Sequence, residues 1–122
     1  MYAQHNLGRA GEEIAADWLM KHGYRLLHIN WSLHQRYELD IVAYRDDVIH
    51  FVEVKTRRRI DDVYGAPEQA VDNKKIMHIS HAAHRYLTHF GYPDNTHYQI
   101  DVIGIVYRGE GDYDVRWVED VK

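Results

Sequence analysis

The chain has 122 residues, the size of one domain with a single core. Hydrophobic residues make up 45% and charged residues 28% of it, a balance that excludes a disordered chain. It contains no cysteine, which excludes disulfides and thiolate metal sites, and its net charge of −4 does not by itself indicate a nucleic-acid binder. No segment has the length and apolarity of a membrane span or a signal peptide. We therefore expect one cytoplasmic domain over residues 1–122, away from membranes.

The first half of the chain predicts a helix followed by three strands. Apolar residues recur every three or four positions over residues 8–22, and Gly23 is a natural helix stop. Residues 24–31, 39–44 and 48–55 have the pattern of strands, and the acidic turn at residues 45–48 joins the last two into a hairpin. The polar stretch over residues 58–66 predicts a loop.

The second half predicts one helix and two strands. The helix begins near Asp72, a favourable N-cap, and ends at Phe90 before Gly91. Residues 98–107 and 113–118 are the strands. The order α-β-β-β-α-β-β favours a single α/β domain, in which two main helices flank a mixed sheet of about five strands in two or three layers.

The predicted hairpin carries charged residues where a buried strand should be apolar. A turn centred on residues 46 and 47 places Asp40 opposite Glu53 and Glu38 opposite Lys55, all on one face. Two opposed carboxylates repel each other, and a divalent cation between them would remove that repulsion. Mg²⁺ suits such a site because it binds one or two protein carboxylates together with water and phosphate. The alternative is a solvated ladder of ion pairs.

Further charged residues lie within reach of this cluster. Glu12 borders the apolar stripe of the first helix and could reach the hairpin, although an acidic residue in a first helical turn needs no such role. Lys55, Arg57 and Arg59 alternate along one strand. Arg36 would lie opposite Arg57, so that a phosphate backbone could meet positive charge beside the carboxylates. An ordinary solvated run of charges explains these basic residues equally well.

Three histidines of the second helix are possible ligands of a second metal site. His78, His81 and His84 are spaced i, i+3, i+6. A helical zinc site usually pairs histidines at i, i+4 with another ligand elsewhere, so the spacing favours a solvated helix face instead.

Several motifs together resemble a known family. The chain contains GRAGEEIAADWLMKHGYRLLHINW, ELDIVAY, FVEVKTR and APEQAV, the last followed by a lysine and AAHRYL. Nearly the whole chain is thereby similar to the bacterial YraN-like family of uncharacterised, endonuclease-like proteins. The combination D…E-x-K with a glutamate on the preceding helix resembles the PD-(D/E)XK nucleases, which include archaeal Holliday junction resolvases. The resemblance implies a restriction-endonuclease-like fold; Tyr37 stands where the family usually has glycine.

The same resemblance implies roles for the acidic cluster. Asp40 and Glu53 would bind Mg²⁺ or Mn²⁺, and Lys55 would be the catalytic lysine. Glu12 would be an additional acidic residue near the metal, and Glu38 a supporting acid.

The resemblance also implies a substrate. Lys74 or Lys75 matches a family lysine that could touch phosphate. We therefore expect a metal-dependent endonuclease that cleaves phosphodiester bonds in DNA, with branched or structured DNA as a candidate, and a homodimer if both strands are cut. The alternative on the same fold is a non-catalytic module that binds nucleic acid or protein.

Overall fold

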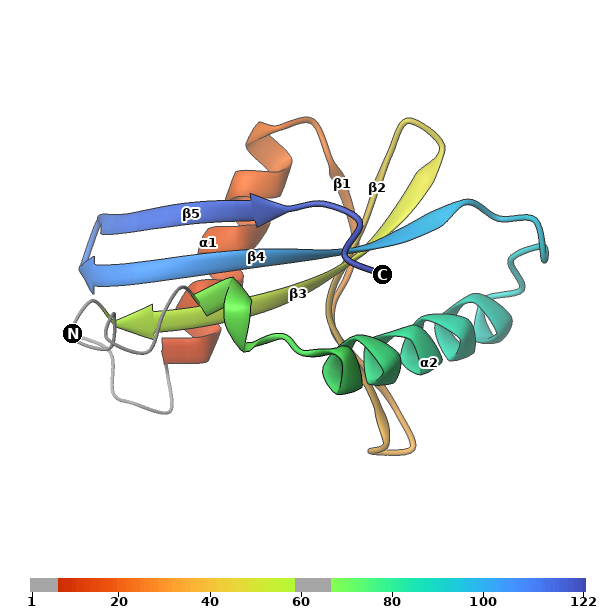
Figure 1. Cartoon of the computed structure of the whole chain (residues 1–122). Helices are drawn as coiled ribbons and strands as arrows, with labels where there is room; N and C mark the ends of the chain where they lie inside the picture. The colour runs from red at the N-terminus through yellow and green to blue at the C-terminus, as the bar shows by residue number, and fades with distance from the viewer. Residues whose placement is uncertain (1–6, 59–66) are drawn as a thin grey trace.

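The computed structural model describes residues 7–58 and 67–122, and its elements follow the predicted order (Figure 1). The main helices are α1 (Leu7–Lys21) and α2 (Asn73–His89), and a short 3-10 helix, η3 (Pro67–Ala70), precedes α2. The strands are β1 (Arg25–Leu33), β2 (Tyr37–Arg45), β3 (Val48–Arg58), β4 (Tyr98–Gly109) and β5 (Asp112–Val118). Each predicted helix and strand is present close to its expected bounds, whereas η3 was not predicted. Of the predicted loop, residues 59–66 lie outside the described residues.

The five strands form one mixed sheet in the order β1-β2-β3-β4-β5. Neighbouring strands are antiparallel, except that β3 and β4 are parallel. A parallel pair needs a long crossover connection, and α2 lies within it. The α1 and α2 helices lie on opposite faces of the sheet, so the fold has three layers (Figure 1).

Two apolar clusters hold these layers together, one on each face of the sheet. The α1 side includes Ala15, Ala16 and Leu19 of the helix with Ile41, Ala43, Val52, Ile103 and Ile105 of the sheet. The α2 side includes Ile79, Ala82, Ala83 and Tyr86 with Trp31, Leu39, Val42, Phe51 and Ile100. Because β2 and β3 contribute to both clusters, their apolar residues are buried on both faces of the sheet.

The start of α2 is fixed by a side-chain cap. Asp72 has an extended backbone, and its carboxylate accepts a hydrogen bond of 2.9 Å from the backbone N–H of Lys75. Such a cap satisfies one of the N–H groups that a helix leaves unpaired at its first turn. The predicted N-cap is therefore confirmed, and it sets Lys75 in the first turn of α2.

α1 comes closest to β3 at Gly11. A Cβ atom on Gly11 would lie 1.9 Å from Oγ1 of Thr56, a separation that real atoms do not reach. By contrast, a Cβ on Gly8 would meet no atom within 4 Å. The missing side chain at Gly11 therefore lets α1 approach the sheet. This close approach also brings the next residue of α1, Glu12, near the sheet.

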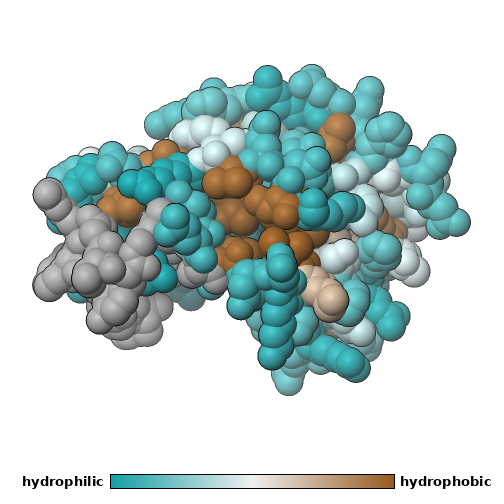
Figure 2. Space-filling model, in the orientation of Figure 1, coloured by the Kyte–Doolittle hydropathy of each residue, from teal (hydrophilic) through white to brown (hydrophobic). Residues whose placement is uncertain are grey.

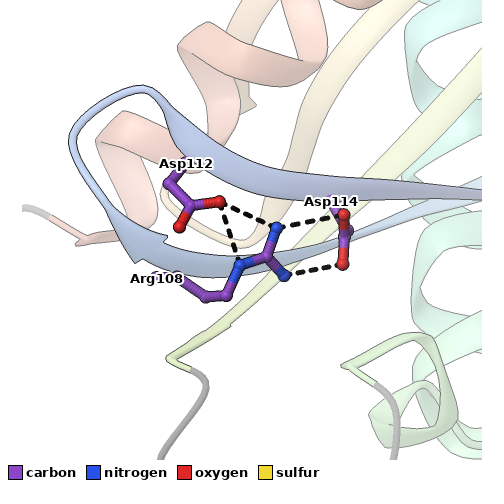
Figure 3. A network of polar contacts seen from close by, with 3 residues as sticks. All are labelled: Arg108, Asp112 and Asp114. Atoms are coloured by element: carbon purple, nitrogen blue, oxygen red, sulfur yellow. Dashed lines mark hydrogen bonds and ion pairs between the residues drawn. The ribbon is translucent and has the colours of Figure 1, made fainter.

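Arg108 clamps the turn between β4 and β5 (Figure 3). Its Nε donates to Asp112 at 3.0 Å, and its two terminal nitrogens donate to Asp114 at 2.7 and 3.1 Å. The hydrogen bond from Arg108 lowers the pKa of Asp114. The positive charge of Arg108 is thus neutralised inside the hairpin, so Arg108 is not a candidate for binding an external anion.

The surface is mixed, with one apolar region on the face that carries α2. Figure 2 shows this region at the centre of the view, between the β4–β5 hairpin and α2, with hydrophilic side chains around it. Among residues 7–58 and 67–122, no helix is long and apolar enough to cross a membrane.

Candidate metal and nucleic-acid site

The pairing of β2 with β3 ends just before the predicted acidic residues. Ile41 and Val52 form the last rung, in the register that the turn predicted. Beyond this rung β3 continues beside β4, but it is no longer paired with β2. Asp40 Oδ2 instead accepts a hydrogen bond of 2.9 Å from the backbone N–H of Val54. A side-chain carboxylate therefore takes the place of a strand carbonyl and is held between the two diverging strands.

β2 also changes face at Asp40. Ile41, on one side of it, packs on the α1 side of the sheet, whereas Leu39, on the other side, packs on the α2 side. This corrects the regular alternation predicted for β2, in which Leu39 and Ile41 share a face. The flanking rungs of β1 place Asn30 opposite Asp40, and Asn30 has a φ of 55°, in the left-handed region. Asparagine tolerates that region better than most residues, but at a cost in free energy.

Glu12 reaches the same point from α1. With its amide nitrogen facing Glu12, Asn30 donates to both carboxylate oxygens, at 3.3 Å to Oε2. The pKa of Glu12 is raised to about 7, chiefly by burial and further by the negative charge of Asp40, while Arg9 lowers it. Sequence reasoning missed Asn30, and the register of β1 against β2 is the signal that could have found it.

Glu53 is buried, with 6% of its surface exposed. Its Oε2 lies 3.3 Å from Nζ of Lys75. Burial raises the pKa of Glu53 to about 8, a hydrogen bond with Asp40 and the charge of Asp40 add to this, and Lys75 lowers it. Without a cation, the site of Glu53 therefore favours the protonated carboxyl.

Three carboxylates from three elements thus gather at one place: Glu12 of α1, Asp40 of β2 and Glu53 of β3. In the described ranges, no group of three or more His, Asp or Glu side chains is arranged as a ready-made metal cage. Asp40 and Glu53 nevertheless fit a hard divalent cation, because Mg²⁺ commonly uses one or two carboxylates and completes its shell with water and phosphate. The pKa values of Glu12 and Glu53 are raised chiefly by burial and further by the negative charge of Asp40, and a bound cation would favour the charged form of both.

The remaining acidic and catalytic candidates flank this cluster. Lys55 lies two residues beyond Glu53 on β3, half-buried and in register with Gly104 of β4. Glu38 is exposed on β2 and borders a hollow of about 220 Å³ that Asn30 and Asp40 also line. The pair predicted between Glu38 and Lys55 lies beyond the last β2–β3 rung, so the ladder does not oppose them.

The predicted basic residues are spread more widely. Arg36 lies in the β1–β2 turn and Arg57 far along β3, beyond the end of the β2–β3 ladder, so the predicted opposition of Arg36 and Arg57 is wrong. Lys74 is exposed on the first turn of α2, and Lys75 forms the ion pair with Glu53 described above. Arg59 lies outside the described residues.

The three histidines of α2 lie on an exposed face of the helix, as the sequence predicted. His78, His81 and His84 are all exposed, and Nε2 of His84 lies 2.9 Å from the hydroxyl of Tyr98. The prediction of a solvated helix face is confirmed.

With this geometry in view, a comparison with known proteins is informative. The model of a family described as "Uncharacterised protein family UPF0102" matches residues 11–105. The chain belongs to the UPF0102 family. A UPF0102 protein of Parabacteroides distasonis is 49% identical over 90 residues, which are 74% of this chain and 72% of that protein. One of Caldicellulosiruptor bescii is 38% identical over 104 residues, 85% of each chain.

A third UPF0102 protein, from Chlorobium phaeobacteroides, is 42% identical over 104 residues, 85% of this chain and 79% of that protein. The YraN-like membership expected from the sequence is confirmed by these matches. The name UPF0102 states no activity, so a function for this chain has to be argued from the site itself.

Proposed function

We propose that this UPF0102 protein is a Mg²⁺- or Mn²⁺-dependent endonuclease that hydrolyses phosphodiester bonds in DNA. The observation that carries the proposal is the meeting of Glu12, Asp40 and Glu53 at the point where β2 and β3 diverge. Buried carboxylates with raised pKa values are costly for a fold to keep, and such groups cluster at functional sites. The E-x-K spacing of Glu53 and Lys55 on β3 supports the same reading.

Each residue has a distinct part in the proposed reaction. Asp40 and Glu53 hold the cation, and Glu12 adds negative charge beside it. When bound, the cation supplies positive charge against the charge that develops on the phosphate. Lys55 orients the attacking water. The water oxygen bonds to phosphorus and releases one proton to solvent, the P–O ester bond breaks, and the leaving oxygen takes up one proton from solvent.

The basic residues supply the contacts to the DNA backbone. Arg36, Arg57, Lys74 and Lys75 can bind phosphates on either side of the cleaved bond. Branched or structured DNA is the candidate substrate. One chain carries one such site, so a homodimer is the simplest way to cut two strands.

One observation favours a second candidate. The ion pair of Glu53 with Lys75 already gives the buried carboxylate a cationic partner, and no ready-made metal cage exists among the described residues. Both facts also suit a non-catalytic module in which the cluster is a structural ion-pair network. Such a module would bind DNA or a protein without cutting.

A cleavage assay separates the two candidates. Purified protein is incubated with linear, nicked, flap and four-way-junction DNA in Mg²⁺, Mn²⁺ or EDTA. We expect metal-dependent cleavage that falls about 100-fold or more in Asp40→Asn and Lys55→Ala, the usual effect of losing a group that acts in the transition state. Glu13→Gln is the matched control, because Glu13 is exposed on α1. Absence of cleavage on every substrate, or equal cleavage by all variants, would reject the enzyme.

A further inference from the structure

A groove opens between the β1–β2 turn and the first turns of α2. It has a volume of about 350 Å³, and Tyr37 lies in its wall. We call it the Tyr37 groove; its polar and aromatic lining consists of Arg36, Tyr37, Glu38, Lys75, His78 and His81. Glu38 is the only acidic residue in that lining, so the Tyr37 groove is more positive than this acidic chain as a whole.

The Tyr37 groove adjoins the carboxylate cluster through two shared residues. Glu38 borders both the groove and the 220 Å³ hollow beside Asp40. Lys75 lines the groove and reaches Glu53 at 3.3 Å. A polymer with one phosphate at Asp40 and Glu53 can therefore place a neighbouring unit in the groove.

Tyr37 contacts two arginines, of which Arg36 lines the groove and Arg85 packs on the Tyr37 ring without lining the groove. The guanidinium of Arg36 lies 5.5 Å from the ring centroid of Tyr37, and that of Arg85 lies 5.2 Å from it. Over residues 7–58 and 67–122, neither guanidinium forms an ion pair with a carboxylate. Arg108, by contrast, is neutralised by two aspartates (Figure 3). Cation–π contacts orient the two planar groups but leave their charges available to a ligand.

We infer that the Tyr37 groove binds an unpaired nucleotide of the DNA strand, next to the phosphate that is cleaved. This inference rests on the proposed function and names its substrate class: DNA that is single-stranded or splayed beside the cut. Proteins bind single strands with a positively charged groove and with aromatic or guanidinium planes on which bases stack. Tyr37 and Arg36 supply the planes, and Arg36 supplies positive charge in the groove.

The shape of the groove favours a single strand over a duplex. A cavity of about 350 Å³ has the size of a small-molecule pocket. The β1–β2 turn bounds it on one side and α2 on the other, which leaves room for one nucleotide. In a duplex each base is stacked and paired, so its faces cannot meet Tyr37 or Arg36.

Binding without cleavage tests the inference. Fluorescence anisotropy in EDTA measures Kd for a labelled single strand, a blunt duplex of the same sequence and a duplex with an unpaired flap. We expect the single strand and the flap to bind about tenfold or more tightly than the blunt duplex, the effect that one base-stacking side chain has on affinity. Tyr37→Ala should abolish this preference without weakening duplex binding, whereas Tyr37→Phe should keep it.

Variants at Arg36, which lines the groove, separate stacking from charge while the Tyr37 ring is kept. Arg36→Lys keeps the charge but loses the plane, so it should lose most of the preference, as Arg36→Gln does. Arg25→Gln removes an exposed arginine at the far end of β1 and should change nothing. Circular dichroism of each variant confirms folding. Equal binding of single strand and duplex by the wild type, or a loss in Tyr37→Ala that is equal for both, would overturn the inference.

The cleavage assay distinguishes failure of the inference from failure of the proposed function. With Mg²⁺, the wild type should cut the flap substrate beside its unpaired nucleotides, and Asp40→Asn should bind the flap without cutting it. Metal-dependent cutting of the blunt duplex with no preference for the flap would leave the nuclease standing and reject the groove's assigned ligand. Flap-selective binding with no cutting under any metal would reject the nuclease and keep the groove as a strand-binding site.

Discussion

Replacing Glu53 with glutamine should stabilise the cation-free protein at alkaline pH. The pKa of Glu53 is raised from 4.5 to about 8 in the folded chain. A group with a raised folded-state pKa contributes stability below its unfolded-state pKa, and that contribution is lost as the pH rises through the folded-state value. The wild type should therefore lose stability between pH 4.5 and about 8, while Glu53→Gln, which has no proton to lose there, should not.

The size of this effect follows from burial and from the neighbours of Glu53. At 1.36 kcal/mol per pKa unit, a rise from 4.5 to about 8 has a ceiling of about 5 kcal/mol. Part of the rise comes from the hydrogen bond with Asp40, so part of the change belongs to the pair, and the partly exposed Lys75 can move toward the new charge. We therefore expect about 2 kcal/mol, or roughly 8 °C in Tm for a domain of this size.

Thermal melts at about pH 5.5 and about pH 8.5, in EDTA and in Mg²⁺, measure the effect. In EDTA, Glu53→Gln should match the wild type at the lower pH and exceed it at the higher one. Mg²⁺ at 100 times its Kd should return about 2.7 kcal/mol to the wild type and little to the variant. Glu13→Gln is the charge control on exposed surface. If the wild type and Glu53→Gln lose stability in parallel between the two pH values, Glu53 is not strained by its site, and the argument for a cation there fails.

Two further predictions concern the residues that build the site. Gly11→Ala should destabilise the protein by about 1–3 kcal/mol, because the added Cβ overlaps Thr56, whereas Gly8→Ala should be neutral or stabilising. Urea melts measure the free energy of unfolding of both variants. A neutral Gly11→Ala would show that α1 can move away from the sheet freely. Asn30→Gly should keep or raise stability, because glycine accepts the left-handed backbone, yet lower metal-dependent cleavage by releasing Glu12. Unchanged cleavage by Asn30→Gly would remove Asn30 from the site.

Local patterns were enough to predict most of the fold. Asp72 as an N-cap and the apolar stripes of both helices depend on neighbours in sequence, and they appear as expected. The hairpin register followed from one assumption about its turn, because a short turn fixes every rung beyond it. The same arithmetic brought Asp40 and Glu53 together before any three-dimensional information was used.

The predictions failed where the regular ladder ends. Counting along two strands cannot show that the β2–β3 pairing stops at Ile41 and Val52. The predicted opposition of Arg36 and Arg57, which lies beyond this rung, was therefore wrong. Asn30 was missed because its role depends on a left-handed backbone and on a rung of β1 against β2. The ion pair of Lys75 with Glu53 depends on how α2 lies across the sheet, which no periodicity contains.

The hydrogen bond from Val54 to Asp40 changes how substitutions at this position should be interpreted across UPF0102. Alanine at residue 40 removes a carboxylate and also leaves the backbone N–H of Val54 without its acceptor. An inactive alanine variant therefore does not separate the loss of the carboxylate's proposed role from damage to the sheet. Asparagine keeps an oxygen for that N–H and removes only the charge. Asparagine at residue 40 should therefore leave the fold intact, whereas alanine should weaken the sheet even if the proposed metal site plays no part.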